Sequence, residues 1–190
     1  MRIMRVGEDI RFRSIKKNTI RFMNVWLLQA LWVMIPISPL LTVMTDQNAH
    51  QKADISVTSY AGLGIWVLGM AIEVIADNQK TTFNTKPENK GKFINVGLWS
   101  ISRHPNYVGE IVLWFGTTLY ALPFMAGLQH VSLLCPIFSY VLLKFISGVP
   151  MLERKSDKKW GEEKEYIQYK ENTPVLFPIG KGDKVEISQK

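Results

Sequence analysis

The stretch Phe22–Met44, FMNVWLLQALWVMIPISPLLTVM, decides the fold class of this 190-residue chain. Its 23 residues carry no charge, and a helix needs roughly 20 mainly apolar residues to cross the hydrocarbon core of a bilayer. Pro36 and Pro39 interrupt the run, but prolines are tolerated in membrane helices because neighbouring groups satisfy the freed backbone carbonyls. The stretch therefore predicts a kinked transmembrane helix.

Three further stretches have a similar length and apolar character, and each carries a single charged residue close to one end. They are residues 55–76 with Glu73, 107–127 with Glu110 and 131–149 with Lys144. Such stretches also predict membrane-spanning helices. We therefore expect an all-α, polytopic transmembrane bundle of about four spans, which forms a single membrane domain over residues 1–190.

Lysine and arginine residues alternate between the two sides of the predicted bundle. Seven precede the first span, five lie in 77–106, and nine lie in the polar tail 151–190, whereas only Lys52 and Lys144 lie elsewhere. Short cytoplasmic loops of membrane proteins carry an excess of these residues. The pattern predicts that both termini are cytoplasmic, with the lipid bilayer as partner and a bacterial inner membrane as the location.

Composition argues against two other classes of function. A net charge of +7 would suit a nucleic-acid-binding domain, but the basic residues are divided among membrane-length stretches, so no nucleic-acid partner is expected. The single cysteine, Cys135, and three distant histidines lack metal-ligand spacing, and no metal is expected. Glycines at Gly62, Gly64 and Gly69 resemble part of a nucleotide-binding loop, but inside a span they favour close helix packing.

The second span ends in a charged sequence, Glu73-Val-Ile-Ala-Asp77-Asn-Gln-Lys80. Residues three or four positions apart share one face of a helix. The two carboxylates are therefore candidates to bind ribose hydroxyls, and Lys80 is a candidate to bind phosphate. A local ion pair at a solvated helix end is the alternative explanation.

The third span begins in a more unusual sequence, Gly97–Glu110, GLWSISRHPNYVGE. Pro105 suits the first turn of a helix, so Arg103 and His104 lie where free backbone N–H groups attract an anion such as phosphate. A membrane-embedded carboxylate costs roughly 2.5–3.5 kcal/mol at mid-bilayer and less near the interface, which makes Glu110 a functional candidate. A structural pair with Arg103 or Lys144 is the alternative for Glu110. Polar neighbours on the same turn are Asn106 and Tyr107.

After the last span, Gly148 and Pro150 break the helix and place Glu153 at the membrane surface. This surface is the one predicted for Asp77 and Arg103. Tyr166 and Tyr169 follow in the tail, where they either flank an aromatic ring or anchor the tail at the interface. The sequence thus predicts that three separate segments converge around one anionic ligand.

These segments resemble the membrane-bound steroid 5-alpha-reductase-like family, in particular its bacterial branch, long labelled a domain of unknown function. The motifs that carry the resemblance are Ala76-Asp77-x-Gln79-Lys80-x-x-Phe83, Gly97-Leu98-Trp99-x-x-Ser102-Arg103-His104-Pro105-Asn106-Tyr107-x-Gly109-Glu110, Ser147-Gly148-x-Pro150-x-Leu152-Glu153 and Thr173-Pro174. The resemblance implies NADPH-dependent reduction of a carbon–carbon double bond conjugated to a carbonyl in a steroid, isoprenoid or other lipid-like substrate. It implies cofactor-binding positions at Asp77, Asn106 and Glu110. Charge and position add Glu73, Lys80, Arg103, His104, Tyr107 and Glu153.

The sequence departs from that family at its beginning. Family members usually have earlier spans whose glutamate and tyrosine grip the substrate carbonyl, and we expect these helices to be absent here. Tyr107 is the hydrogen-bond donor that we nominate as a catalytic substitute. Cofactor binding is accordingly a firmer expectation than turnover.

Two alternatives remain. The first is a membrane methyltransferase of the isoprenylcysteine or phospholipid type that uses S-adenosylmethionine, since those enzymes share the string Arg103-His104-Pro105-x-Tyr107 and a later glutamate pair such as Glu162-Glu163. The stretch around Asp77 and the position of Glu153 favour the reductase. The second is an inactive fragment or membrane scaffold; a transporter is disfavoured because the charges gather at one interface and not at the bilayer midplane.

Overall fold

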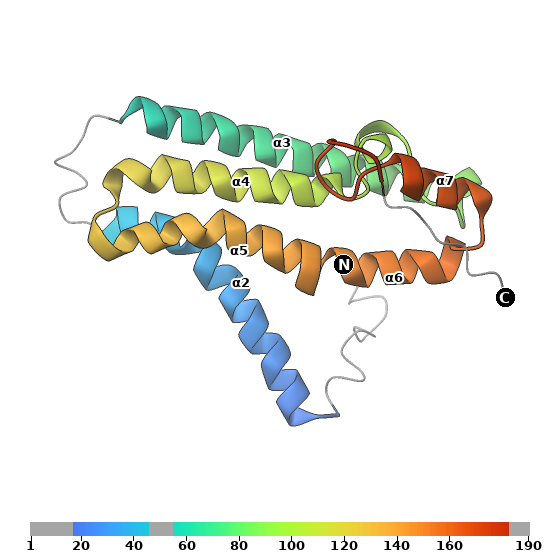
Figure 1. The fold of residues 1–190 in the computed structure, drawn as a ribbon, viewed down its shortest axis with the longest axis horizontal. Helices are drawn as coiled ribbons and strands as arrows, with labels where there is room; N and C mark the ends of the chain where they lie inside the picture. Colours follow the sequence, from blue (N-terminus) through green and yellow to red (C-terminus); the bar gives the residue numbers. More distant parts are fainter. Residues whose placement is uncertain (1–16, 46–54, 183–190) are drawn as a thin grey trace.

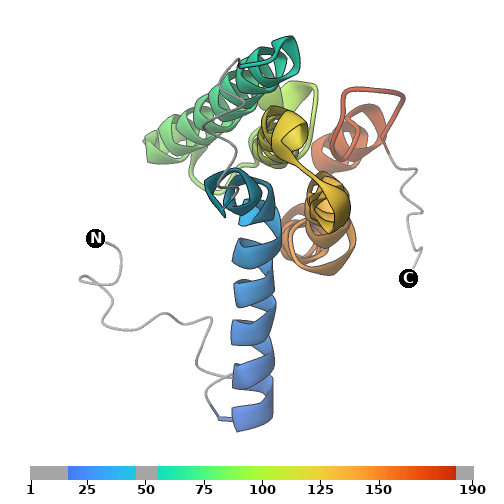
Figure 2. The ribbon, with the colours of Figure 1, turned by 90° about the vertical axis from the view of Figure 1, so that its left-hand side faces the viewer.

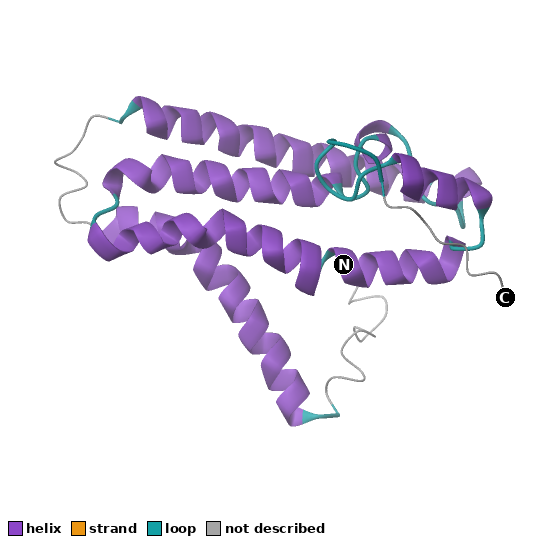
Figure 3. Ribbon diagram, in the orientation of Figure 1, coloured by secondary structure: helices purple, strands orange, loops and turns teal. Residues whose placement is uncertain are grey.

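The computed structural model describes residues 17–45 and 55–182, and within these ranges every regular element is helical (Figure 3). The longer helices are α2 (Thr19–Thr45), α3 (Val57–Thr85), α4 (Pro105–Ala121), α5 (Cys135–Val141), α6 (Val149–Trp160) and α7 (Lys164–Asn172). Short 3-10 turns are η2 (Pro87–Asn89), η3 (Gly97–Ser100), η4 (Leu122–Phe124) and η5 (Gly127–Leu134), and a π-helical turn is η6 (Leu142–Ile146). The predicted all-α class is confirmed.

Three helical segments are long and apolar enough to cross a membrane: Thr19–Thr45, Val57–Thr85 and Gly127–Trp160. They support the predicted bilayer environment. The remaining predicted span, 107–127, corresponds to α4 and η4. With 17 residues, α4 measures roughly 25 Å at 1.5 Å per residue, and it ends where Pro123 removes a backbone donor.

Helices α3 and α4 run side by side along their length (Figure 1). Glycine lets their backbones touch, because a Cβ at Gly69 would lie 2.4 Å from the backbone nitrogen of Leu113, and one at Gly116 would lie 2.4 Å from that of Trp66. Such close approach is the usual role of small residues in membrane helix pairs. A Cβ at Gly64 would have no atom within 4 Å, so Gly64 is not part of the contact between α3 and α4.

Helix α2 packs on the bundle through its second half only. Figures 1 and 2 show its first half leaving the other helices at a wide angle. Pro36 and Pro39 are buried where α2 meets α4 and α5, and the carbonyl of Pro36 accepts a 3.4 Å hydrogen bond from the Cys135 thiol. Large apolar side chains such as Met23 and Leu27 are more than half exposed in the first half.

The second predicted span ends at residue 76, but α3 continues to Thr85 and stops before Pro87. Hydropathy marks the end of the apolar run and not the end of the helix, since polar residues continue a helix equally well. The sequence predicts that the third span begins within Gly97–Glu110. In the structure η3 packs on this extension, because Trp99 Nε1 donates to the Ala76 carbonyl at 2.9 Å and Gln79 Oε1 accepts from the Leu98 N–H at 2.9 Å.

Candidate functional site

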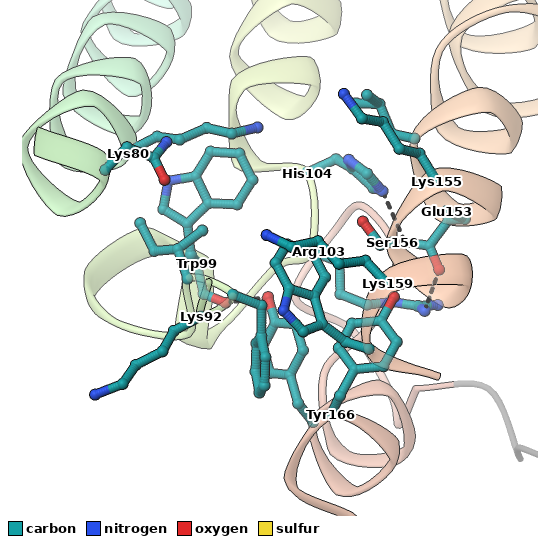
Figure 4. A pocket seen from close by; sticks show the side chains of 16 residues that line it. Lys80, Lys92, Trp99, Arg103, His104, Glu153, Lys155, Ser156, Lys159 and Tyr166 are labelled. Carbon is teal, nitrogen blue, oxygen red and sulfur yellow. Dashed lines mark hydrogen bonds and ion pairs between the residues drawn. The ribbon is translucent and has the colours of Figure 1, made fainter. Parts of the chain in front are cut away.

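Glu153, on α6, is the centre of the site. One of its oxygens, Oε2, lies 2.7 Å from Arg103 Nη1 and 3.3 Å from Lys170 Nζ. Its other oxygen, Oε1, lies 2.9 Å from His104 Nε2 (Figure 4). The carboxylate thus joins the beginning of α4, the middle of α6 and the end of α7.

Local backbone structure positions these side chains. Pro105 is the first residue of α4, so Arg103 and His104 immediately precede the helix. The Arg103 N–H donates to the Pro174 carbonyl at 3.0 Å, which fixes the C-terminal segment against this turn. Gly148 precedes α6, and a Cβ there would lie 2.9 Å from the Tyr107 ring, so only glycine lets α6 start this close to α4.

Aromatic side chains from two segments, the loop after η2 and helix α7, form one wall of the site. The Phe93 ring centroid lies 5.2 Å from that of Tyr166 and 5.4 Å from that of Tyr169. The Tyr169 hydroxyl donates to the Trp99 carbonyl at 2.6 Å, and the Tyr166 hydroxyl donates to Asp157 at 3.1 Å. Burial raises the pKa of both tyrosines, so their hydroxyls stay protonated at neutral pH.

These residues surround a cavity of about 280 Å³ between α3, the loop before α4, α6 and α7 (Figure 4). Its cations outnumber its carboxylates, because Glu153 is the single carboxylate in the lining among residues 17–45 and 55–182. The basic side chains of the lining are Lys80, Lys92, Arg103, Lys155 and Lys159. Lys80 Nζ lies 4.5 Å from the centre of the buried Trp99 ring.

His104 forms a hydrogen bond through one ring nitrogen, Nε2, whereas its other ring nitrogen, Nδ1, has no partner among the described residues. Burial lowers the pKa of His104, and the nearby Arg103 and Lys80 lower it further, against the opposing effect of Glu153. A neutral imidazole next to a carboxylate carries its proton on the nitrogen that faces the carboxylate, here Nε2. Nδ1 is then an acceptor, and it is buried without a partner in the part of the chain that the structure describes.

The structure brings four of the predicted site residues together around the cavity: Lys80, Arg103, His104 and Glu153. Five others do not line it: Glu73, Asp77, Asn106, Tyr107 and Glu110. Tyr107 lies behind His104, with the two rings stacked 5.5 Å apart. The cofactor-binding role of the second group, and the catalytic role of Tyr107, stay predictions.

Glu110 forms a hydrogen bond that the sequence did not predict. Its Oε1 accepts a 3.2 Å hydrogen bond from Trp32 Nε1 on α2. The suggested pairs with Arg103 or Lys144 are wrong, because Arg103 turns to Glu153 and Lys144 donates to the Tyr140 hydroxyl at 2.7 Å. The prediction failed because hydropathy cannot tell which neighbouring helix an intramembrane carboxylate will face.

Several lining residues were missed at the sequence level. Phe93 and Trp160 belong to segments with no motif, and only tertiary packing joins them. Lys155 and Lys159 offered a usable signal, since they are four residues apart and share one helical face with each other. The paired glutamates Glu162 and Glu163 are exposed and do not line the cavity.

One curated relative has a known activity. Over 117 residues the chain is 31% identical to the protein-S-isoprenylcysteine O-methyltransferase of Saccharomyces cerevisiae (strain ATCC 204508 / S288c). The match covers 62% of this chain and 45% of that protein, so the chain spans less than half the length of this relative. No solved structure matches.

The similarity favours the methyltransferase alternative over the predicted NADPH-dependent reductase. The resemblance to the steroid 5-alpha-reductase-like family is not confirmed, and NADPH gains no support from the relative. A match to one protein family covers most of the chain. Residues 1–173 match the family described as "Protein of unknown function (DUF1295)", and the chain belongs to this family.

Proposed function

We propose that this protein is an S-adenosylmethionine-dependent methyltransferase that acts on a lipophilic acceptor at the membrane surface. One observation carries the proposal: Arg103, His104 and Glu153 meet around a cavity at the end of membrane-length helices. The similarity to a membrane methyltransferase supplies the reaction class.

The chemistry of the lining fits this cofactor. Small-molecule sites typically measure about 300–1,000 Å³, and the cavity of about 280 Å³ is close to the lower end of this range. The aromatic wall of Phe93, Tyr166 and Tyr169 offers ring surface for an adenine. Lys80, held above Trp99, offers an ammonium for the amino-acid carboxylate.

The bound cofactor would supply an electrophilic methyl group on a sulfonium centre. The protein's own residues would hold and orient the reactants, and the closely packed aromatic side chains would keep water away from them. Glu153 would fix the guanidinium of Arg103 and the ring of His104 in one orientation. Both groups are almost fully buried, so the arrangement exists before any ligand binds.

The NADPH-dependent reductase remains a second candidate because one observation favours it. Five cations line the cavity with one carboxylate, and the phosphates of NADPH carry several negative charges, whereas the sulfonium of S-adenosylmethionine is positive. The two cofactors therefore have to be compared in one experiment.

Thermal unfolding of the purified protein in detergent distinguishes the candidates. At 100 times its dissociation constant, a ligand adds about 2.7 kcal/mol to the free energy of unfolding. We expect this stabilisation with S-adenosylmethionine and not with NADPH. Lys80→Met should weaken S-adenosylmethionine binding roughly tenfold or more, because a charge-assisted hydrogen bond contributes about 1.5–3 kcal/mol.

Lys158→Met is the matched control, since Lys158 is exposed and lies outside the cavity. It should bind S-adenosylmethionine as the unmodified protein does. Stabilisation by NADPH alone would transfer the assignment to the reductase. Stabilisation by neither cofactor would support a scaffold.

A further inference from the structure

Two lysines of the cavity, Lys155 and Lys159, are not used by the S-adenosylmethionine site proposed above. Lys155 and Lys159 lie one turn apart on α6, and both line the cavity. Within residues 17–45 and 55–182, no carboxylate oxygen lies within 4.0 Å of either ammonium group. Lys159 Nζ instead lies 4.2 Å from the centre of the Trp160 ring.

The carboxylate that lines the cavity with these lysines is already engaged. Both oxygens of Glu153 are occupied by Arg103, His104 and Lys170. Like charges one turn apart on a helical face repel each other. A ligand that brings a negative charge between Lys155 and Lys159 would remove this repulsion.

A second, independent feature belongs to the lining of the same cavity. His104 is 5% exposed, and its Nδ1 is buried with no partner in the described part of the chain. Lys80, His104 and Lys155 all line the cavity. An unpartnered buried acceptor is costly, and a donor on a ligand would satisfy it.

We propose that the cavity binds the headgroup of an anionic glycerophospholipid, with the phosphate between Lys155 and Lys159 and a headgroup hydroxyl donating to His104 Nδ1. The segment Gly127–Trp160, which ends in α6, is long and apolar enough to cross a membrane, so a cavity beside α6 would lie near lipid headgroups. Only the role of this lipid as methyl acceptor rests on the proposed function; the binding site stands without it.

The basic face of α6 permits a matched test. Arg154 and Lys158 are also four residues apart and exposed on α6, but they do not line the cavity. The double variants Lys155→Gln/Lys159→Gln and Arg154→Gln/Lys158→Gln therefore remove the same charge from the same helix. A site in the cavity distinguishes them, whereas general attraction to an anionic surface does not.

The experiment is a calorimetric titration of the full chain in a nonionic detergent. The probes are dihexanoyl phosphatidylglycerol, dihexanoyl phosphatidylmethanol, dihexanoyl phosphatidylcholine and inorganic phosphate. We expect phosphatidylglycerol to bind most tightly, and phosphatidylmethanol, which has the same charge but no hydroxyl, to bind several-fold more weakly. The Lys155/Lys159 variant should lose roughly tenfold in affinity for phosphatidylglycerol, and the Arg154/Lys158 variant less than twofold.

Four results would overturn the proposal. They are equal losses in the two double variants, equal binding of phosphatidylcholine, equal binding of inorganic phosphate, and displacement of phosphatidylglycerol by NADPH. S-adenosylmethionine binding is followed separately by thermal unfolding of the same variants. Loss of lipid binding with S-adenosylmethionine binding retained would identify a failure of this inference alone.

Discussion

At the scale of single residues, the ion pair between Arg103 and Glu153 governs both the site and its stability. The Arg103 side chain is 2% exposed and that of Glu153 is 18% exposed. Removing one partner of a buried ion pair costs up to about 3–5 kcal/mol, although Glu153 would keep its contacts to His104 and Lys170 if Arg103 were removed. A substitution of Arg103 or Glu153 should therefore affect both the candidate site and the stability of the protein.

His104 gives the stability of the protein a defined dependence on pH. Burial, as the largest cause, lowers the pKa of His104 in the folded protein, whereas an unfolded histidine titrates near about 6.5. As the pH falls below that value, the unfolded chain takes up a proton that the folded chain does not. The free energy of unfolding should therefore decrease as the pH falls from about 6.5 through the lower folded pKa.

Thermal unfolding of the protein between pH 7.5 and pH 5.5 checks this expectation. The variant His104→Asn lacks the titrating ring and should show a flatter profile over the same interval. Identical slopes in the two proteins would contradict a depressed pKa at His104.

The sequence predicted the chemistry of individual residues better than their partners. Lys80, Arg103, His104 and Glu153 were chosen for their charge next to helix ends, and the structure gathers them at one cavity. Glu110 was chosen for the cost of burying a carboxylate, but its bond to Trp32 joins residues 78 positions apart. No local pattern records such a pairing, because it depends on where α2 crosses α4.

At the scale of the elements, the contact between α3 and α4 depends on individual glycines. A Cβ at Gly69 would meet the backbone of Leu113, which cannot rotate away as a side chain can. Gly69→Ala should therefore destabilise the protein by about 1–3 kcal/mol, the usual cost of overpacking.

Gly64→Ala on the same helix is the control for this substitution. Nothing lies within 4 Å of a Cβ at Gly64, and alanine is better than glycine in a helix interior by about 0.5–1 kcal/mol. This variant should unfold at an equal or higher temperature. Equal destabilisation by the two substitutions would show that backbone contact is not the cause.

Helix existence was predictable, but helix ends were not. The apolar runs predicted α2 and α3 because burial in lipid requires about 20 apolar residues. The extension of α3 to Thr85 and the mixed 3-10, α and π segments from Gly127 to Ile146 were not predictable. These features follow from packing against η3 and α4, which no periodicity in the sequence encodes.

At the scale of the whole molecule, the distribution of basic residues predicts orientation. The segment Gly127–Trp160 has 34 residues, which is more than the roughly 20 needed to cross the hydrocarbon core. Its two ends should therefore lie on opposite sides, with the basic α6 in the cytoplasm.

Labelling with a membrane-impermeant maleimide in oriented vesicles tests this orientation. Lys158→Cys should react only in inverted vesicles, and Leu128→Cys, in a turn where the side chain is 90% exposed, only in right-side-out vesicles. The native Cys135 is buried and should stay unlabelled in both. Reaction of both introduced cysteines from the same side would refute the topology.

The three contacts of Glu153, to Arg103, His104 and Lys170, have a consequence for comparison with related proteins. Glu153 neutralises the buried Arg103. Its loss should therefore lower the stability of the fold whether or not any reaction takes place at the site. A relative without any enzymatic activity should therefore also carry a carboxylate at this position, because its loss would destabilise the fold. A glutamate at this position in another protein would therefore indicate a similar fold, and it would not indicate enzymatic activity.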